Sequence, residues 1–328
     1  MHMSSVWYSL CFGSTLLFFN LSQTLLAQQM AGVNQEFPFK LSALVLTTEI
    51  VKVFIVLLSI FSDFLKHGTK CDKKFWPTRR TFFLMSVPAM LYTISNTMAY
   101  KTVALMGSTN SQVWSNTRII ITAVLCRVLV PRDMSIVQWL AVFFLLIGVL
   151  CCKEDVGDGK SYSVTMQAIF CAVTQTFSSS LAGVYQEILF KTNKDERIAV
   201  KSIALYSWTC LTSFIQWEFE SAGDESHFFQ GFTHLTWVCA FVNALYGQIV
   251  ALTLFFCDNF VKVFASSLGP IAAMIMDVFY LKSQLSLNQS LGIFIVFMST
   301  ILFYSKIEWL SMKDHEALYF LRGRNLNL

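Results

Sequence analysis

The stretch LSALVLTTEIVKVFIVLLSIFSDF, residues 41–64, decides the fold class of this chain. Apart from Glu49, Lys52 and Asp63 it carries no charge, and most of its residues are Leu, Val, Ile and Phe. A helix that crosses the hydrocarbon core of a bilayer needs about 20 predominantly apolar residues. The stretch therefore predicts a transmembrane helix that holds Glu49 and Lys52 inside the membrane.

Similar apolar blocks recur along the rest of the chain and are joined by short polar segments. They lie near residues 6–27, 81–100, 108–130, 135–152, 164–190, 198–217, 235–256, 259–281 and 291–305. Of the 328 residues, 55% are hydrophobic and 13% are charged, whereas roughly 25% are charged in soluble domains. The clustering excludes two soluble domains and predicts an all-α integral membrane protein with about ten transmembrane helices.

The Lys and Arg residues outside the apolar blocks predict the orientation. Fifteen of the 24 lie in the second, fourth and sixth loops and the C-terminal tail, and five lie in odd-numbered loops. Basic residues in short loops favour the cytosolic side, so both termini are expected in the cytosol. The first block lacks the basic segment that precedes a secretory signal and is expected to remain as a helix. Asn288 begins a glycosylation sequon on the predicted lumenal side, close to a helix end.

Several other protein classes are disfavoured by the composition. The formal net charge is +4, and no basic run alternates with aromatic residues, so nucleic acid is not an expected partner. Eight of the nine cysteines fall inside apolar blocks or directly beside them, where a disulfide framework has no reason to form. No metal-ligand cluster, phosphate loop or nucleophile motif is present. We expect no enzymatic activity, no metal and no cofactor.

Four basic residues remain inside the predicted spans: Lys52, Arg118, Lys201 and Lys262. A cation at the bilayer centre costs at least about 2.5–3.5 kcal/mol on insertion scales, so it normally faces a cavity or has a partner. Glu49 lies three residues before Lys52 on the same helical face. A structural ion pair and a cavity lining are both compatible with that spacing.

Arg118 belongs to a polar stripe along the fourth predicted helix. Ser111, Ser115, Arg118 and Thr122 follow one another at spacings of four, three and four residues, which places them on one helical face. The stripe predicts that Arg118 faces a polar cavity. Glu49 is an alternative structural partner for the guanidinium.

Lys262 lies one turn inside the ninth predicted helix. Asp258 or Asn259 can cap the helix N-terminus, and Lys262 shares a face with Ser266. This arrangement predicts that Lys262 lines a cavity, and the alternative is a salt bridge to Asp258 four residues earlier. Lys201 and Lys52 have weaker cases and could serve the scaffold alone.

Aromatic and amide side chains also recur at helical spacing. Tyr92, Asn96 and Tyr100 are four residues apart, as are Ser202 and Tyr206. Such groups suit stacking on a base and hydrogen bonding to its edge, although interhelical hydrogen bonds are the alternative. Together with two cations and several hydroxyls they predict an anionic ligand with a planar part and a hydroxylated part. A nucleotide sugar has all three features.

These residues lie in stretches that resemble a known family. The stretches are residues 48–52, 87–96, 111–123, 135–148, 182–187, 231–237 and 258–267. In order and spacing they resemble the nucleotide-sugar transporters of the drug/metabolite transporter superfamily, in the branch that carries CMP-sialic acid and UDP-sugars. The most specific stretch is DNFVKVFASS at residues 258–267, which looks like the Asp-Asn-hydrophobic-x-Lys signature of that family.

The resemblance implies an architecture and an activity. It implies ten helices as two inverted five-helix repeats, residues 1–152 and 153–307, around a central cavity, followed by a cytosolic tail, residues 308–328. It also implies alternating access in a Golgi membrane, with the endoplasmic reticulum as the alternative. A cytosolic UDP-sugar or CMP-sialic acid would then be exchanged for a lumenal nucleoside monophosphate. Membrane lipid surrounds such a protein, and a homodimer is compatible with the sequence, which does not determine the oligomeric state.

The predicted binding residues combine both arguments. They are Glu49, Lys52, Tyr92, Asn96, Gln112, Ser115, Arg118, Tyr206, Asn259, Lys262 and Ser266. By the resemblance, Tyr92 and Asn96 match positions of the family near the nucleotide, and Lys262 matches a lysine that contacts the phosphate. Gln112 matches the polar position of the fourth helix and Tyr206 a tyrosine of the seventh, and Arg118 stands where the family usually has lysine.

Three departures from the family pattern prevent a transfer of sugar preference. Ser95 replaces a frequent amide or histidine, Ser111 a tyrosine, and Phe255 a lysine. UDP-galactose, UDP-N-acetylglucosamine and CMP-sialic acid all remain candidates. The departures also motivate an alternative: a family member that no longer transports and that binds or organises glycosylation enzymes.

Overall fold

A computed structural model describes residues 2–30, 37–67, 76–130, 136–151, 166–192, 196–222, 227–269 and 287–305. Nearly all of these residues are helical, and they contain no β-strand. The helices are α1 (His2–Met30), α2 (Leu41–His67), α3 (Arg79–Leu84), α4 (Ser86–Asn116), α5 (Arg118–Leu129), α6 (Ile136–Cys151), α7 (Met166–Thr192), α8 (Ile198–Ser221), α9 (His234–Phe256) and α11 (Leu287–Ser305). Residues 259–269 form a further helical segment. The predicted all-α class is confirmed for this part of the chain.

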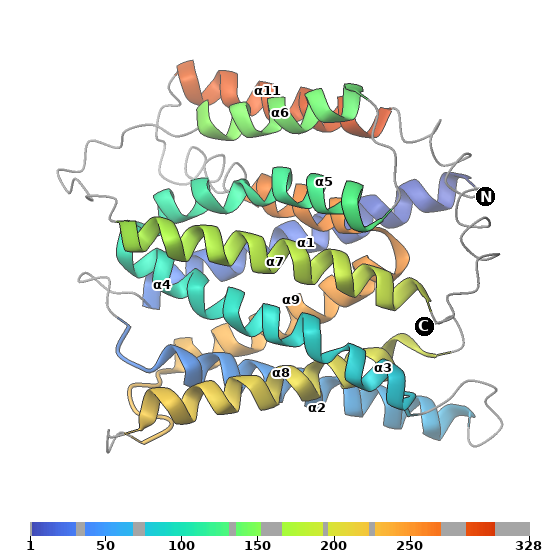
Figure 1. The fold of residues 1–328 in the computed structure, drawn as a ribbon, viewed down its shortest axis with the longest axis vertical. Coiled ribbons are helices and arrows are strands. Elements are labelled where there is room, and N and C mark those ends of the chain that lie inside the picture. The colour runs from blue at the N-terminus through green and yellow to red at the C-terminus, as the bar shows by residue number, and fades with distance from the viewer. Residues whose placement is uncertain are drawn as a thin grey trace.

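The helices run side by side as a bundle in three groups (Figure 1). The pair α6 and α11 packs together at one end, and α2 packs against α8 at the other. Between them lie α1, α4, α5, α7 and α9, with α4 against α7 and α1 against α9. This middle group brings together helices from both halves of the chain.

Four helices among the described residues are long and apolar enough to cross a membrane. They are the segments Leu41–Ser62, Arg79–Val103, Ile198–Ser221 and His234–Phe256, and the segments Val137–Gly148 and Ser290–Phe303 are shorter apolar helices. Most of the ninth predicted span, residues 270–281, lies outside the described part.

In the first of these spans, α2, a charged side chain is buried and large apolar side chains are exposed. Glu49 is only 2% exposed, whereas Phe54 and Phe61 are 60% and 59% exposed. Large apolar side chains that point outward suit lipid, and intramembrane charges normally face the interior of a bundle. The burial pattern of α2 is therefore that of a membrane helix, as residues 41–64 predict.

The third predicted span is bent near its start. Pro88 lacks an N–H group and cannot donate to the carbonyl of Leu84, which removes one helical hydrogen bond. The helix is interrupted at Met85, between α3 and α4, although Met85 itself keeps helical dihedral angles. Thr78 caps α3 by accepting a hydrogen bond from the Thr81 N–H.

The boundary between the third and fourth predicted spans differs from expectation. The hydropathy pattern places a loop at residues 101–107, but helical backbone runs through α4 to Asn116. Ser95 and Ser115 would be about 30 Å apart on a straight helix, yet both hydrogen-bond to Gln175 of α7. The chain therefore still reverses direction between them, by bending within α4.

Lys201 has a structural position and is not among the residues that line the cavity described below. Its side chain is fully buried in α8, and its Nζ donates to the carbonyls of Phe190 at 2.8 Å and Leu189 at 3.4 Å. These carbonyls belong to the last turns of α7, where helical partners are missing. The scaffold role considered for Lys201 is confirmed, since the lysine joins α8 to the end of α7.

Candidate functional site

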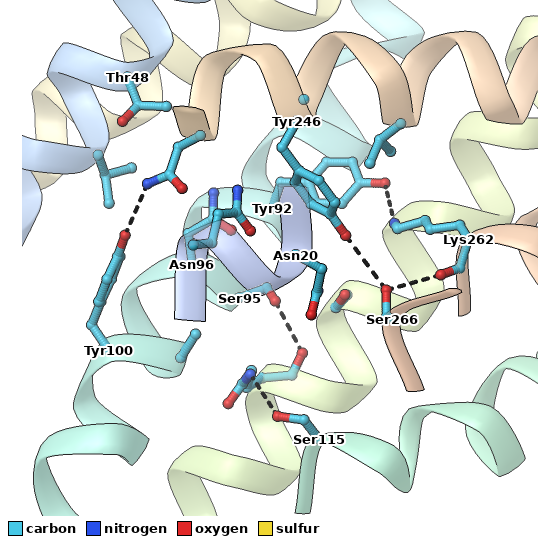
Figure 2. A pocket seen from close by; sticks show the side chains of 18 of the residues that line it. Asn20, Thr48, Tyr92, Ser95, Asn96, Tyr100, Ser115, Tyr246, Lys262 and Ser266 are labelled. Atoms are coloured by element: carbon cyan, nitrogen blue, oxygen red, sulfur yellow. Dashed lines mark hydrogen bonds between the residues drawn. The ribbon is translucent and has the colours of Figure 1, made fainter. Parts of the chain in front are cut away.

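A cavity of about 370 Å³ lies among α1, α2, α4, α5, α7, α8, α9 and residues 259–269. This volume falls within the range of small-molecule sites, roughly 300–1,000 Å³. Nine of the eleven predicted binding residues line it: Glu49, Lys52, Tyr92, Asn96, Ser115, Arg118, Tyr206, Lys262 and Ser266. Figure 2 shows several of them pointing into one space from different helices.

The other two predicted residues are Gln112, whose side chain the structure does not describe, and Asn259, which is absent from the described lining. Gln112 belongs to α4, but its side chain lies outside the described part of the structure. Asn259 is buried, and its side-chain amide contacts the backbone position of Gly183 in α7. The backbone N–H of Asn259 donates to the Glu187 Oε2 at 3.0 Å, and Glu187 also forms an ion pair with Lys191 at 2.6 Å. Asn259 and Glu187 thus join the 259–269 segment to α7.

Lys262 faces the cavity and is held by a phenol rather than a carboxylate. Its Nζ donates to the Tyr92 oxygen at 3.2 Å and lies 5.1 Å from the centre of the same ring. The Tyr92 hydroxyl in turn donates to the Gln186 Oε1 at 2.8 Å. Asp258 caps the helical segment by accepting from the Val261 N–H at 3.0 Å, as predicted. Lys262 does not pair with Asp258.

Arg118 begins α5 and points its side chain into the cavity. Its Nε is buried and has no hydrogen-bond partner, and no carboxylate of the described residues pairs with the guanidinium. Lys262 is near enough for the two positive charges to repel each other. A bound anion would satisfy both groups, whereas an empty cavity leaves them uncompensated.

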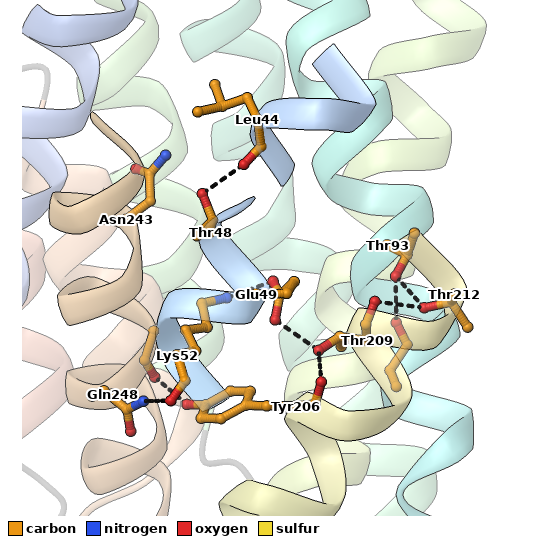
Figure 3. A network of polar contacts seen from close by, with 12 residues as sticks. Leu44, Thr48, Glu49, Lys52, Thr93, Tyr206, Thr209, Thr212, Asn243 and Gln248 are labelled. Atoms are coloured by element: carbon orange, nitrogen blue, oxygen red, sulfur yellow. Dashed lines mark hydrogen bonds and ion pairs between the residues drawn. The ribbon is translucent and has the colours of Figure 1, made fainter. Parts of the chain in front are cut away.

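Glu49, the alternative partner considered for Arg118, bonds elsewhere. Its Oε1 accepts from the Lys52 Nζ at 2.7 Å, and its Oε2 accepts from the Thr209 hydroxyl at 2.7 Å (Figure 3). Lys52 also lies over the Tyr206 ring, 5.5 Å from its centre, and the Tyr206 hydroxyl donates to the Gly247 carbonyl. The spacing of Glu49 and Lys52 is compatible with a structural ion pair or with a cavity lining. Both predictions are confirmed, because the ion pair itself lines the cavity.

The charge of the cavity follows from these contacts. The described lining residues include three cations, Lys52, Arg118 and Lys262, and one carboxylate, Glu49. Because Glu49 neutralises Lys52, the cavity keeps an excess of two positive charges. Within the described residues, no group of three or more His, Cys, Asp or Glu side chains could hold a metal ion. The arrangement suits a ligand with two negative charges.

The sequence patterns missed several polar residues that complete the lining. They are Asn20 and Gln23 of α1, Gln175, Ser179 and Gln186 of α7, Thr209 of α8, and Asn243 and Tyr246 of α9. Asn243 donates to the Tyr100 hydroxyl at 3.3 Å, and Tyr246 shares a hydrogen bond with Ser266 at 3.4 Å. The available signal was the same helical spacing used for Arg118, because Asn243 and Tyr246 are three residues apart and Gln175 and Ser179 four.

Comparison with known proteins agrees with this site. The sequence model of the nucleotide-sugar transporter family matches residues 8–305. CMP-sialic acid transporter 1 of Oryza sativa subsp. indica is 26% identical over 242 residues, covering 70% of this chain and 75% of the relative. CMP-sialic acid transporter 4 of the same organism is 29% identical over 290 residues, covering 85% and 72%.

One solved crystal structure shares the fold, with a TM-score of 0.65 at 9% sequence identity. The match covers 90% of this chain and 97% of the other. The helical bundle, the positively charged cavity within it and the family match over nearly the whole chain lead to one conclusion. This chain belongs to the nucleotide-sugar transporter family.

Proposed function

We propose that this chain is an antiporter that moves a cytosolic nucleotide sugar, a UDP-sugar or CMP-sialic acid, into the Golgi lumen in exchange for a nucleoside monophosphate. The observation that carries the proposal is the pair Arg118 and Lys262, two cations that face a shared cavity with no carboxylate partner in the described residues. Buried charges without counterions are costly, and the phosphates of a nucleotide supply the missing charge.

Each part of such a ligand has side chains that suit it. The Arg118 guanidinium can donate to two phosphate oxygens at once, and the Lys262 ammonium adds a point charge. The rings of Tyr92, Tyr206 and Tyr246 offer flat surfaces for a base. The similarity to proteins named CMP-sialic acid transporters supports a nucleotide-linked sugar as cargo.

The exchange has a physical cause in this proposal. When the cavity is empty, Arg118 and Lys262 lose their solvent on closure without gaining a counterion, so the empty carrier crosses slowly. A bound nucleotide removes that cost in both directions.

The proposed topology has ten spans in two inverted repeats, with both termini in the cytosol. Two such repeats would place the cavity between the two halves of the chain.

Counterflow in proteoliposomes tests the exchange. Vesicles containing the purified full chain are loaded with labelled UMP or CMP, and efflux is followed with and without UDP-galactose, UDP-N-acetylglucosamine or CMP-sialic acid outside. We expect at least one nucleotide sugar to accelerate efflux. Rapid efflux into nucleotide-free buffer, at the rate seen with external nucleotide, would contradict obligatory exchange.

A second candidate function is a non-transporting role as a binding or scaffold protein for glycosylation enzymes. It is favoured by Phe255, which stands where the family has a lysine and packs against the apolar cluster around Phe190 and Leu205. Stabilisation by UMP or CMP together with exchange would exclude this role. Binding without any exchange would support it.

A further inference from the structure

One wall of the cavity is built from short hydroxyl and amide side chains. We call it the amide–serine wall, and its members are Ser95, Ser111, Ser115, Asn116, Gln175 and Ser179. Its residues come from both limbs of the bent α4 and from α7. Only Ser115 belongs to the binding residues that the sequence predicts. Figure 2 shows Ser95 and Ser115 hydrogen-bonded to one residue between them, which is Gln175.

Gln175 is held in place from two sides. The Ser95 hydroxyl donates to its backbone carbonyl at 3.1 Å, and its own Nε2 donates to the Ser115 Oγ at 3.2 Å. Gln175 is 5% exposed, so its side chain has little freedom to turn elsewhere. Asn116 directly follows Ser115 in the sequence and is 6% exposed.

Each of these two amides presents an unused polar atom. The Gln175 Oε1 and the Asn116 Nδ2 are buried without any hydrogen-bond partner, as is the Nε of the nearby Arg118. Buried polar groups in folded proteins are nearly always paired, so unpaired ones call for an explanation. Because Asn116, Arg118 and Gln175 all line the cavity, an unpaired acceptor, an unpaired donor and a cation belong to its lining.

The chemistry of the unused atoms selects the ligand group. Phosphate oxygens can accept from Asn116 and Arg118, but they have no hydrogen to donate to the Gln175 Oε1. A sugar hydroxyl or acetamido group both donates and accepts. A base edge also does so, but bases favour aromatic surfaces for stacking, and none of the described lining residues from α7 or from residues 111–116 is aromatic.

We infer that the amide–serine wall binds the transferred sugar of the nucleotide sugar, and that Asn116 and Gln175 distinguish a nucleotide sugar from a nucleoside monophosphate, whose only sugar is its ribose. The inference rests on the proposed function. In this assignment Arg118 and Lys262 bind the phosphates, which both ligands contain. The amides of Asn116 and Gln175 bind the transferred sugar, which only the nucleotide sugar contains.

The test compares Gln175→Met and Asn116→Leu, which remove the polar atoms while keeping similar size. Affinities of the purified full chain for UDP-galactose, UDP-N-acetylglucosamine and CMP-sialic acid are measured beside those for UMP and CMP. Thr122→Val is the matched control, because the Thr122 hydroxyl is also buried and unpaired but lies outside the cavity.

We expect each amide variant to bind its preferred nucleotide sugar about tenfold more weakly, the loss of roughly one hydrogen bond to a desolvated group. UMP and CMP binding should stay unchanged, and Thr122→Val should bind all ligands like the wild type. Unchanged sugar binding, or a parallel loss of both ligand classes, would overturn the inference. A wild-type chain that binds none of the nucleotides would instead refute the proposed function.

Discussion

Each of the four cations in the predicted spans has a different environment. Lys201 donates to helix-end carbonyls, and Lys52 pairs with Glu49 at 2.7 Å. Lys262 has only the Tyr92 hydroxyl and ring, and the Arg118 Nε has no partner. Desolvation acts on all four, but only the first two are compensated within the protein. The uncompensated two are the ones that a ligand must complete.

Arg118→Met and Lys262→Met are predicted to weaken nucleotide binding strongly without harming the fold. Each removes a charge-assisted contact worth about 1.5–3 kcal/mol, a loss of about 10- to 150-fold in affinity. Because each also removes an uncompensated buried charge, the ligand-free variants should melt at or above the wild-type temperature. Thermal-shift titration with UMP and CMP measures both quantities.

The control for these variants is Arg127→Met, since Arg127 lies on the same helix but is exposed and outside the cavity. It should retain nucleotide-induced stabilisation. If Arg118→Met and Lys262→Met were stabilised by UMP and CMP as strongly as wild type, neither cation would be a phosphate ligand.

Lys201→Met is predicted to have the opposite phenotype. Removing the ammonium leaves the Phe190 and Leu189 carbonyls without their side-chain donor, at a cost of about 1–3 kcal/mol. The melting temperature should fall, while the nucleotide-induced shift persists because Lys201 does not line the cavity. Loss of nucleotide binding with intact stability would show that Lys201 is not a scaffold residue.

At the level of elements, hydropathy predicts helix positions better than helix continuity. The starts of α2 at Leu41 and α8 at Ile198 agree with the sequence prediction. The loop expected at residues 101–107 is helical, because a polar interruption changes the burial of a segment without breaking its backbone hydrogen bonds. Pro88 marks the interruption at Met85 directly, since it removes a donor.

The pairing of α6 with α11 depends on a small residue. A Cβ at Gly148 would lie 2.7 Å from the Val296 Cγ2 and 3.0 Å from the Gly292 oxygen. Small residues at such contacts let membrane helices approach closely. Gly148→Ala should therefore lower stability by about 1–3 kcal/mol, the usual cost of overpacking. Nucleotide binding should be kept, because no described side chain of either helix contributes to the cavity lining.

The matched control is Gly13→Ala in α1, where the added Cβ would meet only the Val261 Cγ1, at 4.0 Å. Thermal melts of the two purified variants should separate by several degrees, with Gly13→Ala close to wild type. Equal melting temperatures would show that the α6–α11 contact relaxes without cost.

At the scale of the molecule, the sequence predicts which residues reach the cavity but not how they are paired. Stripes at helical spacing identify Arg118, Lys262 and Tyr92, because intramembrane charges and polar stripes rarely face lipid. They do not show that Gln186 pairs with Tyr92, or Gln175 with Ser95 and Ser115, since these partners lie on another helix, 60 to 94 residues away along the chain. Pairing between helices depends on how the bundle packs, which periodicity does not contain.

The excess of two positive charges in the cavity predicts how binding responds to pH. The second pKa of a phosphate monoester is about 6, so the dianionic fraction of UMP or CMP falls about fourfold between about pH 7.5 and pH 5.5. A nucleotide sugar has no such ionisation in this range and keeps both charges. If the cavity selects dianions, affinity for UMP should fall about fourfold relative to affinity for a UDP-sugar. Competition binding at both pH values measures this ratio, and the nucleotide sugar serves as the internal control for titration of the protein. A constant ratio would show that the second negative charge does not contribute to binding at Arg118 and Lys262.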